Sequence, residues 1–588
     1  MDKYRWDLTK IFKNEEEYND TIKEVNCLVD EINKYKDIIM KNSENLLKVL
    51  ELDDKLDLLI EKLYVYTHLE YYSDMSSTLY QEKKEKVLSL LDEVSNKTSF
   101  LSPEILSYDY NIVLDYIKSN KKLERFSLSL ERLFKYKKYT LSLEEEHILS
   151  MTGEIMRVPE DAYSNINNVD VKFDHIKDEN GNVVELNQSN YSTYIESKDR
   201  RVRKSAFNKM YKYYKEHINT ISSLYIGNVK NNAFVSKVRK YPSILYMHLY
   251  PDDVDETLYE NLIKVTNDNI KCLKEFYKYK SKELGYKLHM YDLYVNTSKI
   301  INKKVSYEDA IKIVNNALLP LGKEYLSTFN HLLNNNCVDV YPRKNKRVGA
   351  YQWGSYGSEP YVSLNYEDNM DSVSTLIHEM GHAMHSYYSD SAQEYQYAGY
   401  PIFLAEIAST VNEVLLSEYL FNSTDNKDEK AYYLIEFLDR FKATVYRQVM
   451  FSEFESIIHK KYENGESITK ELLCDEYYKL NKKHFGGVVN IDEDIKYEWA
   501  RIPHFYTSFY VYKYATGFIS ALLIADKILN DPSTKDKYIE FLSSGNTKYP
   551  LDLLKILDID LKDKKTLNRA FEIFNEKLNK LKELGSDK

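Results

Sequence analysis

The chain of 588 residues is predicted to be a mainly α-helical protein with a small β-sheet. Long segments of charged and apolar residues at helical spacing dominate it, for example residues 53–72 and 78–95. Only 16 glycines and 11 prolines interrupt them, so the connections between helices should be short. Strand patterns are confined to a few stretches, of which residues 171–186 and 361–366 are the clearest.

The first strand pattern is predicted to mark a domain boundary. Residues from about 10 to 160 predict successive helices, and a β-hairpin follows them. Its strands are expected at residues 171–176 and 183–186, around the turn sequence Asp-Glu-Asn-Gly at 178–181. We therefore expect an N-terminal helical domain over residues 1–200, with the hairpin near its end, and a second domain over residues 201–588.

Farther along, a glycine-punctuated loop is expected at residues 347–357 and a short strand at residues 361–366. A free strand edge there could pair with an extended peptide backbone, with little demand on side-chain identity. An internal hairpin would leave no such edge. The glycines lack the following Lys-Ser/Thr of a phosphate-binding loop, so no nucleotide site is predicted.

One short motif points to chemistry. Residues 378–382 read His-Glu-Met-Gly-His, which places two imidazoles four residues apart on one face of a predicted helix, with its N-cap expected at Asp371-Ser372. Two such histidines can bind one Zn²⁺ ion, which lowers the pKa of a bound water toward about 7. Glu379 points off that face and can take the proton of the water. A chance match on an ordinary helix is the alternative, but buried polar groups need partners, and a metal supplies them.

A catalytic zinc site normally takes a third protein ligand. His385 lies near the same helix face, but seven residues from His378 is roughly 10 Å along the axis, which makes it hard for both to reach one ion. Glu406 is the better candidate, because it falls close to the apolar side of a second predicted helix, where an unpaired carboxylate is costly. Glu413, on the same face, could orient a ligand histidine or simply face solvent.

Four segments resemble the thimet-oligopeptidase-like zinc metallopeptidases, and together they span nearly the whole chain. They are residues 4–8, 378–385, 403–410 and 501–506. The resemblance implies a large helical shell that encloses the active site in a deep substrate channel, with a small β-sheet beside the zinc-binding helix. It also implies that residues 201–588 form the zinc peptidase domain.

The resemblance assigns roles to individual residues. It implies that His378, His382 and Glu406 bind one Zn²⁺ per chain, and that Glu379 is the general base. The preference for Glu406 over His385 then agrees with the spacing argument.

A second candidate group follows residue 503. His504 precedes Tyr506, Tyr510 and Tyr514, which recur every four residues and would line one helical stripe. Related peptidases use a His and helically spaced Tyr residues to bind the substrate and the oxyanion of the tetrahedral intermediate. We expect this role for His504 and Tyr510, with Tyr514 as a further candidate, and packing roles for Tyr506 and Tyr512. In the thimet branch the first Tyr would fall at Phe509, so the spacing departs from it by one residue.

The amino-acid composition limits the partners and the cellular location that we expect for this protein. A net charge of −11 argues against nucleic acid, which requires a concentrated positive surface. The four cysteines are far apart, which predicts neither a disulfide framework nor a thiolate zinc site and suits a reducing compartment. No stretch has the pattern of a secretory signal or a membrane span. We expect a cytoplasmic protein that acts on oligopeptides, with no membrane partner and an oligomeric state that the sequence leaves open.

The leading hypothesis is a zinc endopeptidase that hydrolyses internal bonds of oligopeptides by metal-activated water. An exopeptidase of similar fold, such as a dipeptidyl carboxypeptidase, would need a cation to capture a peptide terminus. Arg343, Lys344, Arg347 and Arg501 are the candidates for that cation. A non-catalytic helical peptide-binding protein is the third alternative, and it would require a closed metal site or a missing base.

Overall fold

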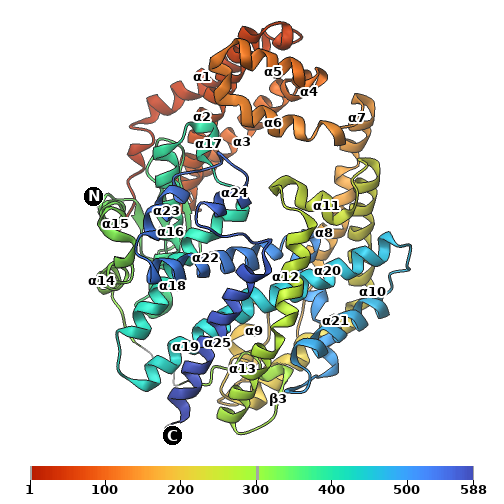
Figure 1. The fold of residues 1–588 in the computed structure, drawn as a ribbon, viewed down its shortest axis with the longest axis vertical. Coiled ribbons are helices and arrows are strands. Elements are labelled where there is room, and N and C mark those ends of the chain that lie inside the picture. Colours follow the sequence, from red (N-terminus) through yellow and green to blue (C-terminus); the bar gives the residue numbers. More distant parts are fainter. Residues whose placement is uncertain (1–2, 299–302, 587–588) are drawn as a thin grey trace. The chain divides into compact units, whose positions relative to one another are not determined.

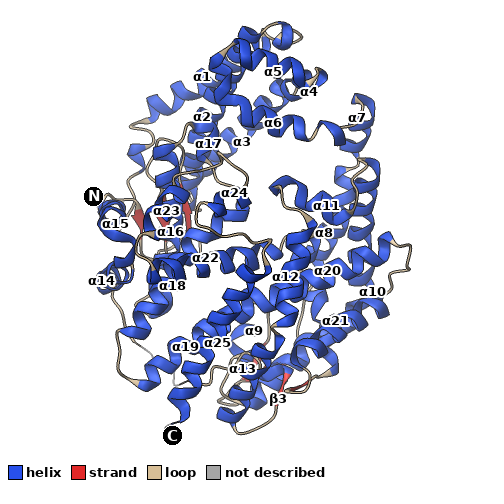
Figure 2. Cartoon of the chain, viewed as in Figure 1, coloured by secondary structure: helices blue, strands red, loops and turns tan. Residues whose placement is uncertain are grey.

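The computed structural model describes residues 3–298 and 303–586, and these residues form a mainly helical protein (Figures 1 and 2). Strands are short and few: the described residues contain seven, each two or three residues long. The predicted fold class is therefore confirmed. None of the helices over the described residues combines the length and apolar composition that a bilayer crossing requires.

Internal contacts divide the chain into two compact units, each built from three separate stretches of sequence. The first unit contains residues 1–140, 302–416 and 524–558, and the second contains residues 141–301, 417–523 and 559–588. The predicted domain boundary near residue 200 lies within the second unit and stays a prediction.

The first unit holds most of the helices that surround the candidate site. Its helices are α1 (Glu15–Asn33), α2 (Ser43–Ser73), α3 (Thr78–Thr98), α4 (Leu101–Ser107), α5 (Tyr110–Ser119), α6 (Ser127–Lys135), α14 (Tyr307–Ala317), α15 (Gly322–Asn334), α16 (Met370–Ala392), α17 (Tyr395–Ala398), the first part of α18 (Ile402–Asn422), the last part of α22 (Tyr512–Asn530), α23 (Thr534–Leu542) and α24 (Pro550–Lys555).

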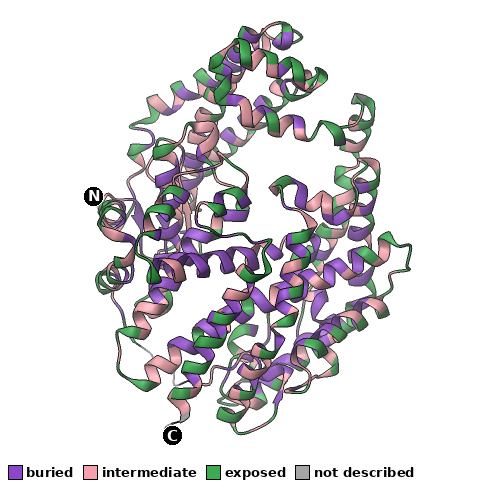
Figure 3. Cartoon of the chain, viewed as in Figure 1, coloured by how far each residue is buried: buried purple, intermediate pink, exposed green. Residues whose placement is uncertain are grey.

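The N-terminal helices of the first unit match their sequence patterns. The segments predicted at residues 53–72 and 78–95 lie within α2 and α3, which pack against each other and against α1. Each helix buries one side and exposes the other, as the alternating colours in Figure 3 show. On α2, for example, Leu52, Leu56 and Leu63 are each 5 % exposed or less. Helical periodicity in the sequence therefore reports burial correctly here.

A three-stranded sheet completes the first unit. Its order is β4 (Val338–Asp339), β6 (Tyr361–Ser363), β5 (Tyr351–Trp353), with β4 parallel and β5 antiparallel to β6. The segment 347–357, predicted as a loop, thus contains a strand, because Tyr351 to Trp353 pair with Ser363 to Tyr361. The predicted strand β6 is the central one, and β5 is an outer strand of this sheet.

The second unit is also helical, and it contains the predicted hairpin. Strands β1 (His175–Lys177) and β2 (Val183–Glu185) pair antiparallel, so the hairpin is confirmed, although β1 begins four residues later and ends one residue later than predicted, and β2 is one residue shorter. Its other α-helices and strands are α7 (Leu143–Met151), α8 (Gly153–Asn168), α9 (Tyr191–Ile195), α10 (Arg200–Val238), α11 (Ile244–Leu249), α12 (Glu256–Asp268), α13 (Ile270–Leu284), β3 (Leu288–His289), the last part of α18, α19 (Lys427–Phe441), α20 (Arg447–Glu463), α21 (Lys470–Phe485), β7 (Val489–Asn490), the first part of α22 and α25 (Lys564–Ser586). A π-helical turn (Lys442–Tyr446) joins α19 to α20.

Candidate metal centre

The two histidines of the sequence motif lie on α16, in the first unit. The helix begins after Asn369, whose side chain accepts a hydrogen bond from the backbone N–H of Ser372 at 2.9 Å. The N-cap is therefore two residues earlier than the predicted Asp371-Ser372. The predicted apolar side is fully buried against β5, β6 and neighbouring helices; it consists of Val373, Leu376, Ile377, Met380 and Met384, each 0 % exposed.

Helix α18 lies against α16 at Gly381, between the two motif histidines. A Cβ atom at Gly381 would lie 2.5 Å from the Cα of Ser409 and 2.9 Å from the carbonyl oxygen of Ala408. Real side chains do not approach backbone this closely, so only glycine allows the two helices to come together here. The motif spacing alone gives no sign of this requirement, because the contact is with a distant segment of the chain.

Three potential ligand atoms converge beside this contact. The Nε2 atoms of His378 and His382 are 3.2 Å apart, and Oε2 of Glu406 lies 3.5 Å from the first and 3.7 Å from the second. Four ligands around a tetrahedral zinc ion, each about 2.1 Å from it, are separated by about 3.4 Å. The spacing of the three donor atoms and their chemistry therefore fit a zinc ion. Among the His, Cys, Asp and Glu side chains of residues 3–298 and 303–586, these three form the one group close enough to share an ion.

Both histidines are held by a second partner. Oε1 of Glu413 lies 3.4 Å from Nδ1 of His378, and the backbone of Ala405 hydrogen-bonds His382. Burial lowers the pKa of His378, but the hydrogen bond and charge of Glu413, with smaller effects of Glu379 and Glu406, raise it above its usual value. Such partners fix the ring orientation of metal-binding histidines. The alternative in which Glu413 simply faces solvent does not match its 16 % exposed side chain.

His382 is neutral near pH 7. Burial, together with the charge of His378, lowers its pKa to about 4. A neutral imidazole is the form that donates a lone pair to a metal ion.

Glu379 is buried beside the donor atoms, with 8 % of its surface exposed. Burial raises the pKa of its carboxyl to about 7, against the opposing charge of His378, and the backbone N–H of Gln352 donates a hydrogen bond to the carboxylate. Gln352 belongs to β5, so the sheet holds this side chain in place. A carboxylate with a pKa near neutrality is suited to accept a proton at physiological pH.

A chain of polar contacts leads from Gln352 to the segment before α18. The hydroxyl of Ser386 donates to Oε1 of Gln352 at 3.4 Å and lies 3.1 Å from the hydroxyl of Tyr400. Because Ser386 is on α16 and Tyr400 precedes α18, these contacts join the three elements that carry the site.

His385 lies outside the group of donor atoms. Its ring is 1 % exposed and stacks on the ring of Tyr400, with centroids 3.7 Å apart and planes inclined by 6°. Burial lowers its pKa to about 3, with a smaller effect of His382. The structure thus places Glu406, and not His385, beside the two motif histidines.

A cavity of about 700 Å³ adjoins this part of the first unit. Ser386, Tyr400, Gln352 and Trp353 line it, together with carboxylates that the sequence analysis did not single out. These are Asp54, Asp57, Glu61 and Asp390. Three of them come from α2, and their position beside α16 depends on tertiary packing that helical periodicity does not report.

His504 and Tyr510 belong to the second unit, where they contact each other. Their rings are nearly parallel with centroids 6.5 Å apart, and the hydroxyl of Tyr514 lies 3.4 Å from Nε2 of His504. All three are exposed or partly exposed, whereas Tyr506 and Tyr512 are buried.

The predicted helical stripe of tyrosines is wrong. Tyr506 ends a short 3₁₀ turn, and α22 begins only at Tyr512. Between them Phe509 has φ of 57°, a left-handed conformation that cannot continue a helix. Its backbone N–H instead donates to the buried carboxylate of Glu455 at 2.9 Å.

Known proteins similar to this chain are peptidases. The model for "Peptidase family M3" matches residues 193–573, and the model for "Oligopeptidase F" matches residues 104–173. The chain is 38% identical to Oligopeptidase PepF of Bacillus subtilis, over 98% of the chain and 87% of that protein. It is 34% identical to Group B oligopeptidase PepB of Streptococcus agalactiae, over 99% of this chain and 97% of that protein.

Solved structures give the same result. A proposed peptidase from Chlamydophila abortus is 33% identical, with a TM-score of 0.93 over 99% of this chain and 98% of that one. Oligoendopeptidase-F from Enterococcus faecium is 33% identical, with a TM-score of 0.75 over 97% and 99%.

Proposed function

Because the chain belongs to peptidase family M3, we propose that it is a zinc-dependent endopeptidase that hydrolyses internal bonds of oligopeptides. The observation that carries this proposal is the convergence of three donor atoms beside one buried carboxylate. His378, His382 and Glu406 would hold the ion. When bound, zinc supplies a Lewis acid that lowers the pKa of water and polarises the scissile carbonyl.

Glu379 is the proposed general base. Its carboxylate accepts a proton from the attacking water and can return it to the leaving amine. The hydrogen bond from the backbone of Gln352 supports this role, because it fixes the carboxylate while leaving an oxygen to accept the proton. No covalent bond between enzyme and substrate is required.

His504 and Tyr510 are proposed to contact the substrate in the transition state. A Tyr hydroxyl can donate a hydrogen bond to the carbonyl oxygen as negative charge develops on it, and His504 can help hold that group. The exposure of both side chains supports this proposal, as does their contact with Tyr514, which could share the role.

Strand β5 is the proposed docking edge for the peptide backbone. Within the described sheet β5 pairs with β6 on one side only, and its Gln352 already contacts the proposed base. An extended peptide added to such an edge is recognised mainly through its backbone, which suits a broad range of oligopeptides.

The contacts of three candidate cations disfavour the exopeptidase alternative. Arg343 makes two hydrogen bonds with Asp339, Arg347 stacks over Tyr72, and Arg501 stacks over Tyr191. The names of the Enterococcus and other relatives also specify endopeptidases. A peptide of about ten residues with both ends blocked distinguishes the two activities. Internal cleavage is expected, and an uncut blocked peptide with trimming of the unblocked one would establish an exopeptidase.

The variant Glu379→Gln tests the mechanism. It keeps the shape of the side chain but removes the base, so zinc content should be unchanged while kcat falls by at least about 1,000-fold. Glu82→Gln, on the exposed side of α3, is the matched control and should retain full activity. Near-normal turnover by Glu379→Gln would refute the base role. Wild-type protein that holds zinc and binds peptides without cleaving them would support the non-catalytic alternative instead.

The proposed location is the cytoplasm. All four cysteines are free thiols, which suits a reducing compartment. Oligopeptides are the proposed partners, and the charge of −11 disfavours nucleic acid.

A further inference from the structure

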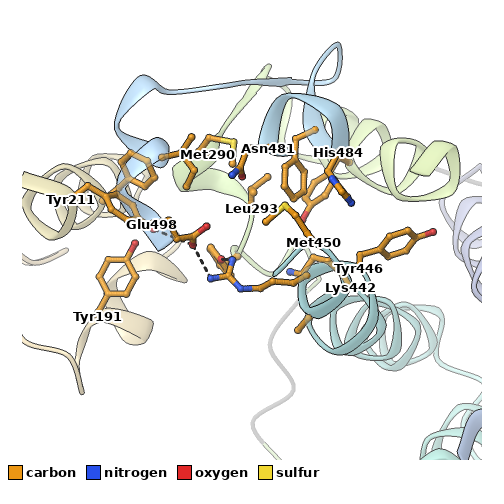
Figure 4. A pocket seen from close by; sticks show the side chains of 17 residues that line it. Tyr191, Tyr211, Met290, Leu293, Lys442, Tyr446, Met450, Asn481, His484 and Glu498 are labelled. Carbon is orange, nitrogen blue, oxygen red and sulfur yellow. Dashed lines mark hydrogen bonds and ion pairs between the residues drawn. The ribbon is translucent and has the colours of Figure 1, made fainter. Parts of the chain in front are cut away.

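A second cavity lies among buried residues of the second unit, and Figure 4 shows its lining. Its volume is about 40 Å³. The lining residues come from α9, α10, α13, α20, α21, the π-helical turn Lys442–Tyr446 and the segments 290–294 and 495–498. Apolar side chains such as Met290, Leu293 and Met450 form much of the surface, so the polar groups that also reach it need explanation.

Three polar side chains on the cavity wall have an atom without a hydrogen-bond partner among the described residues. The atoms are the hydroxyl oxygen of Tyr277, Oδ1 of Asn481 and Nε2 of His484. The residues are 0 %, 1 % and 1 % exposed, respectively. Buried polar atoms in folded proteins are nearly always hydrogen-bonded to protein or to ordered water.

The existing hydrogen bonds determine what each atom can do. Nδ1 of His484 lies 3.0 Å from the carbonyl oxygen of Leu480, so Nδ1 carries the proton and Nε2 presents a lone pair. The amide nitrogen of Asn481 donates to the carbonyl oxygen of Tyr477 at 3.0 Å, so Oδ1 is also an acceptor. The hydroxyl of Tyr277 can donate or accept. An occupant must therefore donate at least two hydrogen bonds.

The charges on the wall exclude an ion. Arg447 pairs with Glu498 at 2.7 Å, and Lys442 pairs with Asp439 at 2.8 Å, so both cations already have a counter-charge. Neither pair therefore leaves an uncompensated charge to attract an ion, and an anion would also face the lone pairs of Asn481 and His484. Burial also lowers the pKa of His484 to about 4, which keeps its ring neutral. The occupant is a neutral hydrogen-bond donor.

The volume of the cavity then favours water as the occupant. A water molecule requires about 10–15 Å³ of such volume and two to four polar partners. We propose that the cavity binds a cluster of two or three water molecules that bridge Tyr277 on α13 to Asn481 and His484 on α21. The cluster ties these two helices together beside the π-helical turn. It is independent of the proposed peptidase activity.

A crystal structure of the zinc-loaded enzyme at about 1.5 Å resolution or better tests the proposal. Two or three density peaks within about 3.2 Å of the three atoms are expected. A dry cavity would overturn the proposal, as would a direct hydrogen bond from Tyr277 to Nε2 of His484. A larger organic molecule in the density would also overturn it.

A solution measurement gives a second test. Oxygen-17 magnetic relaxation dispersion counts long-lived internal waters, and the variant His484→Phe should lose at least one relative to wild type. The matched control is His217→Phe, because His217 makes the same bond from Nδ1 to the carbonyl four residues earlier but is exposed on α10. Equal counts in His484→Phe and wild type would contradict the proposal. If His484→Phe does not fold, the wild-type crystal structure decides.

Discussion

Gly381 of α16 and Ser409 of α18 lie so close together that a methyl group on Gly381 would be 2.5 Å from the Cα of Ser409. The proposed ligands come from both helices, two from α16 and Glu406 from α18. The separation of these helices therefore sets the distance from Glu406 to the histidine pair. Within the motif, the glycine is therefore a structural requirement for the convergence of the three proposed ligands.

Replacing Gly381 by alanine should force α18 away from α16. We expect Gly381→Ala to bind zinc at least about tenfold more weakly and to lose about 1–3 kcal/mol of stability, as overpacked cores do. Zinc affinity by chelator competition and kcat/KM would measure the effect. Gly153→Ala, where a Cβ meets nothing within 4 Å, is the control and should behave like wild type. Unchanged zinc affinity in Gly381→Ala would show that the helices can separate without cost.

Glu413 should act through His378. Its carboxylate lies 3.4 Å from Nδ1 of that ring, so Glu413→Ala removes the partner that orients the imidazole. Loss of such a partner typically weakens metal binding by about 10–100-fold. The matched control is Glu51→Ala, an exposed carboxylate of the same unit. Excess zinc should restore much of the activity of Glu413→Ala, whereas a deficit that persists at saturating zinc would point to direct participation in the reaction.

The hydroxyl of Tyr400 should help position the proposed base. It contacts Ser386, which contacts Gln352, and Gln352 holds Glu379. We expect Tyr400→Phe to keep its zinc and to lower kcat by about 3–10-fold, the effect of one hydrogen bond. A larger change in KM than in kcat would contradict this positioning role.

The control for that variant is Tyr387→Phe, which removes a partly exposed hydroxyl from the same helix. It should leave kcat and zinc content unchanged. Because the ring of Tyr400 remains in Tyr400→Phe, the stack with His385 is preserved and the comparison isolates the hydroxyl.

Glu455 in the second unit should make stability depend on pH. Burial raises the pKa of its carboxyl to about 8, although the hydrogen bond from the backbone N–H of Phe509 lowers it. In the unfolded chain, Glu has a pKa of about 4.3. Between these two values the folded protein retains a proton that the unfolded chain loses. The contribution of this group to stability is therefore full below about pH 4 and falls as pH rises toward 8.

The variant Glu455→Gln cannot ionise and should remove this dependence. Urea titrations at pH 5.5 and at pH 8 give the free energy of unfolding of both proteins. The difference between wild type and the variant should fall by about 3 kcal/mol from the lower to the higher pH. Glu82→Gln should parallel wild type. If the stability of Glu455→Gln changes with pH in the same way as that of wild type, Glu455 is already ionised at pH 5.5.

Local patterns in the sequence predicted the helices and the three side chains whose donor atoms converge. The spacing of His378 and His382 is a property of one helix, and the apolar pattern around Glu406 reports which side of a second helix is buried. Both features are present in the structure because helical geometry and the buried side of a helix depend on neighbouring residues of the sequence. The hairpin at β1 and β2 follows for the same reason, since its turn sequence lies between its strands.

Features that depend on contacts between distant segments escaped prediction. The approach of Gly381 to Ser409 and the hydrogen bond from Gln352 to Glu379 join residues on different elements. The tyrosine stripe failed for a different reason. Periodicity alone predicted one helix through Tyr506 and Tyr514, but the left-handed backbone of Phe509 interrupts it, and the N–H of Phe509 bonds to Glu455, a residue distant in the sequence.

The division of the first unit into three stretches bears on how the protein is made. Helix α23 (Thr534–Leu542) packs on α16, where Phe541 approaches His385 with ring centroids 5.9 Å apart. A ribosome releases the histidine motif well before it releases α23, so the nascent chain carries α16 with one side uncovered until α23 has emerged. The proposed metal centre therefore gains its complete surroundings only after α23 has been synthesised. No single cut in the sequence yields a fragment with that centre intact and its neighbours complete.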